Sequence, residues 1–553
     1  MNQFPSDQEE APPSYEWCTS QSSQFAEFRS YVYSQMLIDE EIKIRHFLAP
    51  EFMPSASEVA AHLKLMKAFG RLKESMLQNS RGIVTPEEYE HRWKVFVTIA
   101  VRRFIMFVSA LKMHASRFTR EPRKLEASSD NRSQEFTRMA NKLIPPMDVL
   151  MVWHAFLMNP MSFYDVFVRN DMYYFINYPF PLHLIDSYID DTTFDYRVPH
   201  ETQTVYLLFV VDFATEEPSL EYDIDLSTLL RQKVTLHCPH TGVPISSPVP
   251  LTSPDHCGFV DRCFITENLG PALRNLDLSE IKPLELSHDV LRKIILDHDI
   301  QEGRLLQGSV KNSSIISNID FPFEGPIAVS ESIADRVAKS SQALSRTTPD
   351  ATLEEILHQT IADNEGMAEI ETLILFHYDT FNPVSLTVPH SVLIGEDLVE
   401  FVIREGEFVE RINDLDWVLP EAVRNDLTRT LAAYESFFEL LAANCFTKTL
   451  LPPLVIQLLL QTHQLMLYGY IRDCKYSICE TLIDNNDKVG QNRLRGVAEL
   501  IPSGSSCGPR EVSAGTPANL VWHPPPGTGC AYESISRIRV RLRAFRLPFH
   551  GRL

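Results

Sequence analysis

Three side chains suited to proton transfer or metal binding lie in two short apolar segments. Asp148 and His154 belong to residues 145–154, which read PPMDVLMVWH, and His463 belongs to residues 452–465. Imidazole titrates near neutral pH and is a common metal ligand. Positions 148 and 154 do not share a helix face, so a direct pair within one helix is not expected. One hypothesis is a common cleft where His154 and His463 bind a metal ion or a small acid, with carboxylates completing the ligand set.

The same residues also have a structural interpretation, which we prefer. Trp153 would pack in an aromatic core, and the neighbouring His154 would hydrogen-bond to a carbonyl or an adjacent helix. The catalytic candidates are therefore Asp148, His154 and His463, with no role assigned to any of them.

Cys238, His240, Cys257 and Cys263 are the candidate ligands for zinc. Zinc takes about four nitrogen or sulfur ligands, usually from two close pairs. Cys238 and His240 could form one pair, but Cys257 and Cys263 are six residues apart, wider than a zinc knuckle. A loop with unpaired thiols is the preferred interpretation.

His377 and Asp379 have the spacing of an iron-binding triad in which His463 would be the distant ligand. Such a triad needs a β-scaffold, whereas His463 stands in a helical pattern, so a chance tripeptide is preferred. The sequence contains no Gly-rich phosphate loop, no G-x-S-x-G elbow and no H-E-x-x-H motif.

Composition indicates a folded protein: 44% of the 553 residues are hydrophobic and 22% are charged. The net charge of −22 disfavours nonspecific binding to nucleic acids or anionic membranes. The first ten residues lack the basic and apolar regions of a secretory signal, and no apolar run reaches about 18 residues. With nine cysteines, an odd number, we expect free thiols in a reducing compartment, hence a cytoplasmic protein, with the nucleus also open.

The expected fold is mainly α, with two related helical units, a small mixed α/β region between them and flexible ends. The boundaries follow shifts in composition and periodicity: a lead-in at 1–22, unit 1 at 23–195, the β-containing region at 196–307, a Ser-rich linker at 308–350, unit 2 at 351–490 and a Pro-, Gly- and Arg-rich tail at 491–553.

Local signals place several elements. Ser55 with Glu58 and Thr85 with Glu88 have the spacing of capping boxes at helix starts. The helix after Thr85 carries an apolar stripe at spacings of three and four, made of Trp93, Phe96, Val97, Ala100, Phe104 and Phe107. The run VYLLFVV at 205–211 predicts a strand, and the stretches 391–406 and 420–444 predict amphipathic helices.

An internal repeat appears at an offset of 307 residues, where 145–152 (PPMDVLMV) aligns with 452–459 (PPLVIQLL). The first copy resembles the D-x-x-x-V-W-H-A-x-x-L-N-P motif of the glycine-rich domain-containing protein-like family of fungi and plants. The matching residues are Asp148, Trp153, His154, Asn159 and Pro160.

The second copy resembles the family's V-W-H-T-H-Q-L motif in a worn form. THQL remains at 462–465, while Leu460 and Gln461 replace the Trp and the first His. Residues 482–489 resemble the F-I-D-H-x-D-K segment that follows this motif. The resemblance covers roughly residues 85–490 and indicates a divergent fungal member, but it implies no particular reaction.

The two ends suggest partners. Pro12, Pro13 and Tyr15 form a PPxY motif of the kind that WW domains bind. After residue 490 there are nine Arg, no Lys and three Glu, and 537–543 read RIRVRLR. This tail is the only part suited to nucleic acid, and we expect it to be foreign to the folded domain.

The leading functional interpretation is a non-enzymatic scaffold or regulatory protein whose aromatic-lined surface, including Trp153, binds a protein partner. The alternative is a metal-dependent or accessory enzyme of fungal secondary metabolism that uses His154 with Asp148 or His463.

Overall fold

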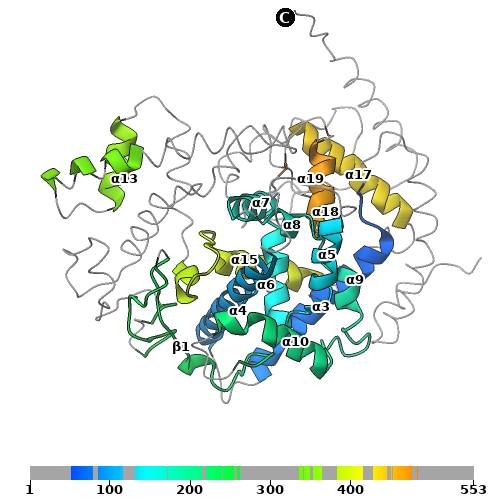
Figure 1. Ribbon diagram of the computed structural model, residues 1–553. Coiled ribbons are helices and arrows are strands. Elements are labelled where there is room, and N and C mark those ends of the chain that lie inside the picture. The colour runs from blue at the N-terminus through cyan, green and yellow to red at the C-terminus, as the bar shows by residue number, and fades with distance from the viewer. Residues whose placement is uncertain are drawn as a thin grey trace, which may run out of the picture.

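The computed structural model shows a mainly helical protein (Figure 1). It describes residues 52–78, 85–115, 131–170, 172–214, 220–239, 241–254, 258–261, 264, 336–340, 342–344, 346–348, 353–363, 383–414, 427–444, 450, 452–475, 477 and 482–483.

The first half holds helices α3 (Ala56–Gln78), α4 (Pro86–Ala115), α5 (Asn131–Ala140), α6 (Met147–Leu157), α7 (Pro160–Arg169), α8 (Tyr173–Ile176), α9 (Leu182–Asp186) and α10 (His200–Val210), the 3-10 helices η1 (Val211–Phe213) and η2 (Leu229–Arg231), and strands β1 (Lys233–Val234) and β2 (Val249–Pro250). The second half holds α13 (Leu353–Asp363), η5 (Pro383–Thr387), α15 (Leu398–Asp414), α17 (Leu427–Asn444), α18 (Leu454–Gln464) and α19 (Leu467–Lys475).

Helices α3 and α4 begin at the two predicted capping boxes. The Ser55 amide donates to Glu58 Oε2 at 2.7 Å, and the Glu58 amide donates to Ser55 Oγ at 3.3 Å. Thr85 and Glu88 make the same reciprocal pair at 3.0 and 3.2 Å. Each pair satisfies two amides that a helix start leaves without an intrahelical acceptor.

Helix α4 lies at the centre of the core. All six residues of its predicted apolar stripe are buried, and the helix packs against α6, α15, α10 and η5. Helix α15, from the second half of the chain, packs on α3, α4 and α6. One continuous hydrophobic core therefore joins residues of both predicted helical units. No described side chain of helix α13 belongs to that core, and the helix lies apart from the main body in Figure 1.

The two copies of the aligned segment adopt the same local structure. Helix α6 and helix α18 each have 11 residues, running from 147 to 157 and from 454 to 464, an offset of 307. Each has a proline as its N-cap residue, Pro146 and Pro453. The next helices, α7 and α19, begin at 160 and 467, again 307 apart.

Polar contacts fasten the second half of the chain to the first. Arg404 Nη2 donates to Asn159 Oδ1 at 2.7 Å, and Asn413 Nδ2 donates to the Met66 carbonyl at 3.1 Å. A buried cation organises the first half in a similar way. Lys64 is 1% exposed. Its Nζ donates to the backbone carbonyl of Asp186 at 3.0 Å and lies 3.4 Å from Oδ1 of the Asp186 carboxylate.

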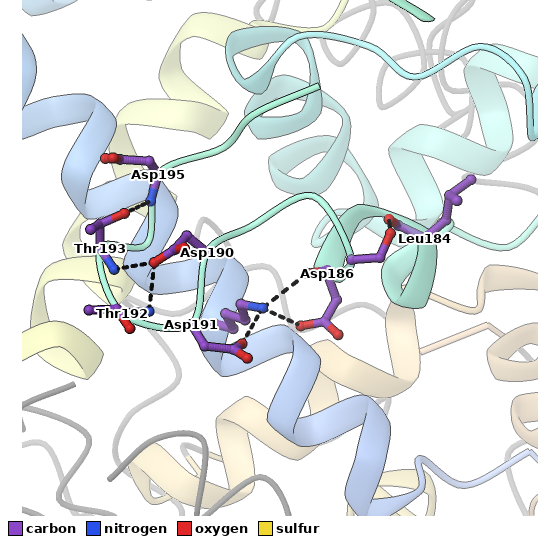
Figure 2. A network of polar contacts seen from close by, with 9 residues as sticks. Leu184, Asp186, Asp190, Asp191, Thr192, Thr193 and Asp195 are labelled. Carbon is purple, nitrogen blue, oxygen red and sulfur yellow. Dashed lines mark hydrogen bonds and ion pairs between the residues drawn. The ribbon is translucent and has the colours of Figure 1, made fainter. Parts of the chain in front are cut away.

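Figure 2 shows the turn that follows Asp186. The carboxylate of Asp191 makes a second ion pair with Lys64, and Asp190 Oδ1 accepts from the amides of Thr192 and Thr193 at 2.8 and 2.7 Å. This turn and α9 are thereby held against α3, since a buried ammonium requires such partners.

The predicted strand at 205–211 is wrong, because these residues form the end of α10 and the start of η1. A continuous apolar run has no period that separates strand from helix. The predicted helix at 391–406 begins only at Leu398, where Asp397 Oδ1 caps the Glu400 amide at 3.0 Å. The predicted β-structure between the units is confirmed but small, with β1 and β2 pairing antiparallel over two residues each.

Among the described residues, no helix combines the length and apolar character that crossing a bilayer requires.

Candidate functional site

The Trp153 ring is 2% exposed and lies in an aromatic cluster. It stacks on Phe175 with ring centroids 5.1 Å apart and meets the edge of Phe180 at 5.0 Å. Phe107 and Tyr178 complete the cluster at 6.0 and 6.1 Å. This placement favours the anchoring interpretation, because a buried ring offers no surface to a partner protein.

Asp148 lies at the first turn of α6 and makes an ion pair with Arg103 of α4, with Nε 2.9 Å from Oδ2. Arg103 also donates to the carbonyls of Glu221 and Tyr222. Burial raises the pKa of Asp148 to about 6, although the Arg103 charge opposes that shift. The Asp148–Arg103 ion pair therefore joins α6 to α4, and Arg103 in turn joins α4 to the segment before η2.

His154 makes a short contact with a histidine that the sequence did not single out. Its Nε2 lies 2.8 Å from Nε2 of His62 on α3, and both residues are buried. The other nitrogen of His62, Nδ1, lies 2.8 Å from the Thr462 hydroxyl on α18. Thr462 in turn donates to the Leu458 carbonyl at 2.7 Å. We call the row Thr462–His62–His154 the histidine row.

The hydrogen bonds fix the protons along the histidine row. The single hydroxyl proton of Thr462 goes to Leu458, so Thr462 accepts from His62 Nδ1–H. Burial lowers the pKa of both histidines, to about 3 for His154, and both rings are therefore neutral at physiological pH. Neutral His62 then accepts at Nε2 from His154 Nε2–H, which leaves a lone pair on His154 Nδ1. Among the described residues that atom has no hydrogen-bond partner.

His463 belongs to a different polar cluster. Its Nδ1 lies 2.9 Å from the Tyr434 hydroxyl, and its Nε2 lies 3.1 Å from Asp473 Oδ2. The same carboxylate oxygen accepts from the Phe52 amide at 3.0 Å. The Tyr470 ring also lies against His463, with centroids 5.0 Å apart. In the part of the chain that the structure describes, no contact joins His154 to His463, and a common cleft between them is not formed.

His154 instead lines a cavity of about 300 Å³ between α3, α4, α6 and α15. Glu405 of α15 lines the same cavity and accepts from Gln461 Nε2 at 3.0 and 3.2 Å. Gln461 is the position that aligns with His154 across the repeat. His154 therefore lines the cavity directly, whereas the aligned Gln461 contacts it through the carboxyl group of Glu405.

Burial raises the pKa of Glu405 to about 8, with Gln461 and the nearby Arg404 and Arg411 opposing the shift. This carboxyl group is therefore mostly protonated at neutral pH. The cavity wall therefore carries one exchangeable proton, on Glu405, beside the hydrogen-bond acceptors of Glu405 and neutral His154.

Most of the predicted zinc ligands lie outside the described residues, namely His240, Cys257 and Cys263. Cys238 is 1% exposed, and its backbone forms a tight turn in which the Gly242 amide donates to its carbonyl at 2.8 Å. Gly242 has φ 65°, which explains a glycine there without a metal. Among the described residues, no three His, Cys, Asp or Glu side chains are placed to hold a metal ion.

Other predicted features also lie outside the described residues: His377 with Asp379, the PPxY residues Pro12, Pro13 and Tyr15, and the tail at 491–553. Sequence reasoning missed His62, Thr462 as a hydrogen-bond partner, and Glu405. A lone histidine inside the apolar stretch after Ser55 was the available signal for His62, since such a residue needs a buried partner.

Comparisons with known proteins agree with the motif resemblance. Residues 324–473 match the model of the family described as glycine-rich domain-containing protein-like. The matched segment includes α15, α17 and α18, and with them Glu405, Thr462 and His463. No curated protein and no solved structure matches the chain. The match covers most of unit 2 with its THQL motif, so this part of the chain is similar to the glycine-rich domain-containing protein-like family.

Proposed function

We propose that this chain is a non-enzymatic interaction protein whose motif helices are internal anchors. One observation carries the proposal: the three catalytic candidates are each held by a different set of internal partners. Asp148 pairs with Arg103, His154 contacts His62, and His463 lies between a tyrosine hydroxyl and a carboxylate. Each of these contacts joins two different helices, which is what a structural anchor does.

An exposed apolar face on α10 and η1 supports an interaction role. Val205, Leu208 and Val211 are 45%, 68% and 46% exposed, whereas Tyr206 and Val210 are 2% exposed. The helix thus buries one apolar face and presents another to solvent. Adjacent exposed apolar side chains are typical of protein-binding surfaces. We name Val205, Leu208 and Val211 the α10 face.

The partner that fits the α10 face is a protein helix with an apolar stripe flanked by basic residues. Glu201 and Asp212 stand exposed at the two ends of this face, and the chain as a whole has a net charge of −22. Apolar contact would supply the affinity, and opposite charges would set the orientation. The PPxY motif would add a second contact with a WW-domain protein.

A photo-crosslinking amino acid at position 208 tests this proposal in cells. We expect it to capture a segment with an apolar stripe and basic flanks, and the corresponding synthetic peptide should bind the purified chain. Leu208→Asp should weaken that peptide's binding at least tenfold. The matched control is Val243→Asp, which changes an apolar residue of 45% exposure away from α10. Equal binding by the two variants would refute the role of the α10 face.

Metal analysis separates this proposal from the enzymatic alternative. Purified protein should contain no stoichiometric transition metal, and His154→Gln should change stability without removing a bound metal. A metal present at one equivalent in the wild type and absent in His154→Gln would favour the enzyme and overturn the scaffold.

A further inference from the structure

The cavity beside His154 has the composition of a ligand site that neither the family match nor the interaction role assigns. Its volume of about 300 Å³ is at the lower end for sites that hold small organic ligands. Apolar side chains from all four helices line it, including Phe69, Trp93, Met151, Val402 and Val409. Such walls favour an apolar body in the ligand.

Two buried acceptors at the wall lack donors. His154 is 1% exposed, and its Nδ1 carries the lone pair that the histidine row leaves over. Asn413 also lines the cavity, and its Nδ2 is committed to the Met66 carbonyl, which fixes the amide and leaves Oδ1 as an acceptor. Among the described residues neither acceptor has a hydrogen-bond partner. A ligand that satisfies them must bring N–H or O–H donors.

The charges around the cavity decide between these donors. The carboxylates Glu74, Glu90, Glu410 and Asp414 line it together with the mostly protonated Glu405, and Lys73 is the only cation among the described lining residues. Lys73 is engaged in an ion pair with Glu410, and Glu74 is paired with Arg71 outside the lining, which leaves Glu90 and Asp414 as the lining carboxylates without a paired cation among the described residues. An excess of carboxylates over cations in a partly closed site concentrates positive ligands.

A neighbouring hydroxyl reports the same negative field. The pKa of Tyr89 rises to about 12, first because of burial and then because of Glu410, Glu90 and Glu74. Aromatic rings of the cavity already contact one ammonium group of the protein itself. Lys73 Nζ lies 5.5 Å from the centroid of the Trp93 ring and 5.8 Å from that of Tyr89, in cation–π range.

We propose that this cavity binds a small organic ammonium ion whose apolar body packs between Trp93 and Val402 and whose N–H groups bond to His154 Nδ1, Asn413 Oδ1 and Glu405. A neutral alcohol could satisfy the two unpaired acceptors but would gain nothing from the carboxylates. The inference does not rest on the α10 face, since the two surfaces share no residue.

The chain offers a substitution that fills the cavity without crowding the fold. Gly406 lines the cavity from the middle of α15, and a Cβ at that position would meet no atom within 4 Å. Gly406→Leu therefore places a side chain in open space and also replaces a poor helix former with a good one. Gly406→Ala provides the small control.

Calorimetric titration of the full chain with 2-phenylethylamine tests the proposal, with 2-phenylethanol and 3-phenylpropionate as matched probes. We expect the amine to bind at least tenfold more tightly than the alcohol, and the acid not to bind. Binding of the ammonium ion should release the Glu405 proton to solvent and leave its carboxylate as the counter-ion, so Glu405→Gln should weaken the amine at least tenfold and leave the alcohol unchanged. Glu407→Gln, which changes an exposed carboxylate on the same helix that does not line the cavity, should change neither.

Gly406→Leu should abolish amine binding, while Gly406→Ala should retain most of it. A wild type that fails to bind the amine at millimolar concentration, or that binds amine and alcohol equally, would overturn the proposal. So would full amine binding by Gly406→Leu. Thermal unfolding of each variant ensures that a loss of binding is scored only on folded protein.

Discussion

The rings of His62 and His154 meet through their Nε2 atoms at 2.8 Å, and a single proton lies between these two nitrogens. The Thr462 hydroxyl determines its position, because it can only accept from the far side of His62. A residue of α18 therefore sets the tautomer of a histidine on α6, with α3 between them. The second aligned segment, at 452–465, takes part in this arrangement through Thr462 and not through His463.

Removal of both rings should cost less than the sum of the two single removals. His62→Leu leaves the His154 Nε2–H buried without an acceptor, which destabilises the fold by about 1–3 kcal/mol before any loss of packing. In His62→Leu/His154→Leu neither polar group remains, so the double variant should be more stable than the sum of the single changes predicts. Urea unfolding of the four proteins measures this coupling.

The control is His183→Leu, which changes an exposed histidine and should stay within about 0.5 kcal/mol of wild type. Strict additivity of His62→Leu and His154→Leu would contradict the hydrogen bond between the rings.

The histidine row should make the fold sensitive to mild acid. The folded-state pKa of His154 is about 3 and that of His62 is lowered too, whereas both titrate near 6.5 when unfolded. The unfolded chain therefore binds more protons between these limits. The stability contribution is complete above about pH 6.5 and is lost progressively as the pH falls towards 3, by up to about 1.4 kcal/mol per pH unit for each ring. Unfolding free energies measured from pH 8 to pH 5 should show this slope.

Glu405 should contribute with the opposite sign. Its folded-state pKa of about 8 exceeds the ordinary value of 4.5, so the folded chain holds the extra proton and loses stability as the pH rises through that interval. Glu405→Gln should therefore stabilise the fold more at pH 8 than at pH 5. His62→Leu/His154→Leu should flatten the acid side only. An unchanged acid slope in that double variant would assign the effect to other groups.

Lys64 should be essential for the stability of the fold, although charged side chains are seldom buried in a core. Lys64→Met leaves the Asp186 carboxylate, 2% exposed, without its cation, and breaking a buried pair in this way costs about 3–5 kcal/mol. Asp191 is 42% exposed and can turn to water. Lys94→Met, on the exposed side of α4, should be nearly neutral. Similar unfolding midpoints for the two variants would refute the role of the buried ammonium.

Gly242→Ala should destabilise the turn at 238–243 for two separable reasons. The φ of 65° costs an L-residue about 1 kcal/mol, and a Cβ there would overlap the His390 ring. His390 itself has φ 54°, so His390→Gly removes the ring without straining the backbone. In that background Gly242→Ala should keep only the backbone part of its cost. Complete rescue would show that the ring alone matters.

The local features of the fold could be predicted from the sequence, but the cross-chain contacts could not. Both capping boxes depend on residues three apart, and the helix starts at Ser55 and Thr85 are confirmed. The strand at 205–211 was wrong because the α10 face is as apolar as the buried face, so hydrophobicity carried no period.

The candidate site was predicted in part. The sequence singled out His154 but not its hydrogen-bond partner, because His62 lies 92 residues from His154 and 400 from Thr462. No spacing rule reaches over such separations. Glu405 could be recognised only when α15 was seen to pack against α6, which brings the carboxylate to the wall of the cavity.

The separation of 400 residues between His62 and Thr462 has a consequence during synthesis. At a translation rate of about 5–20 residues per second, α3 leaves the ribosome roughly 20–80 s before α18. Throughout that interval His62 Nδ1 lacks its Thr462 partner, and for most of it the faces of α3 and α6 that α15 covers are unpacked. The core of the nascent chain therefore stays incomplete until α18 has been made, and we expect the nascent chain to depend on chaperones that hold unfinished chains.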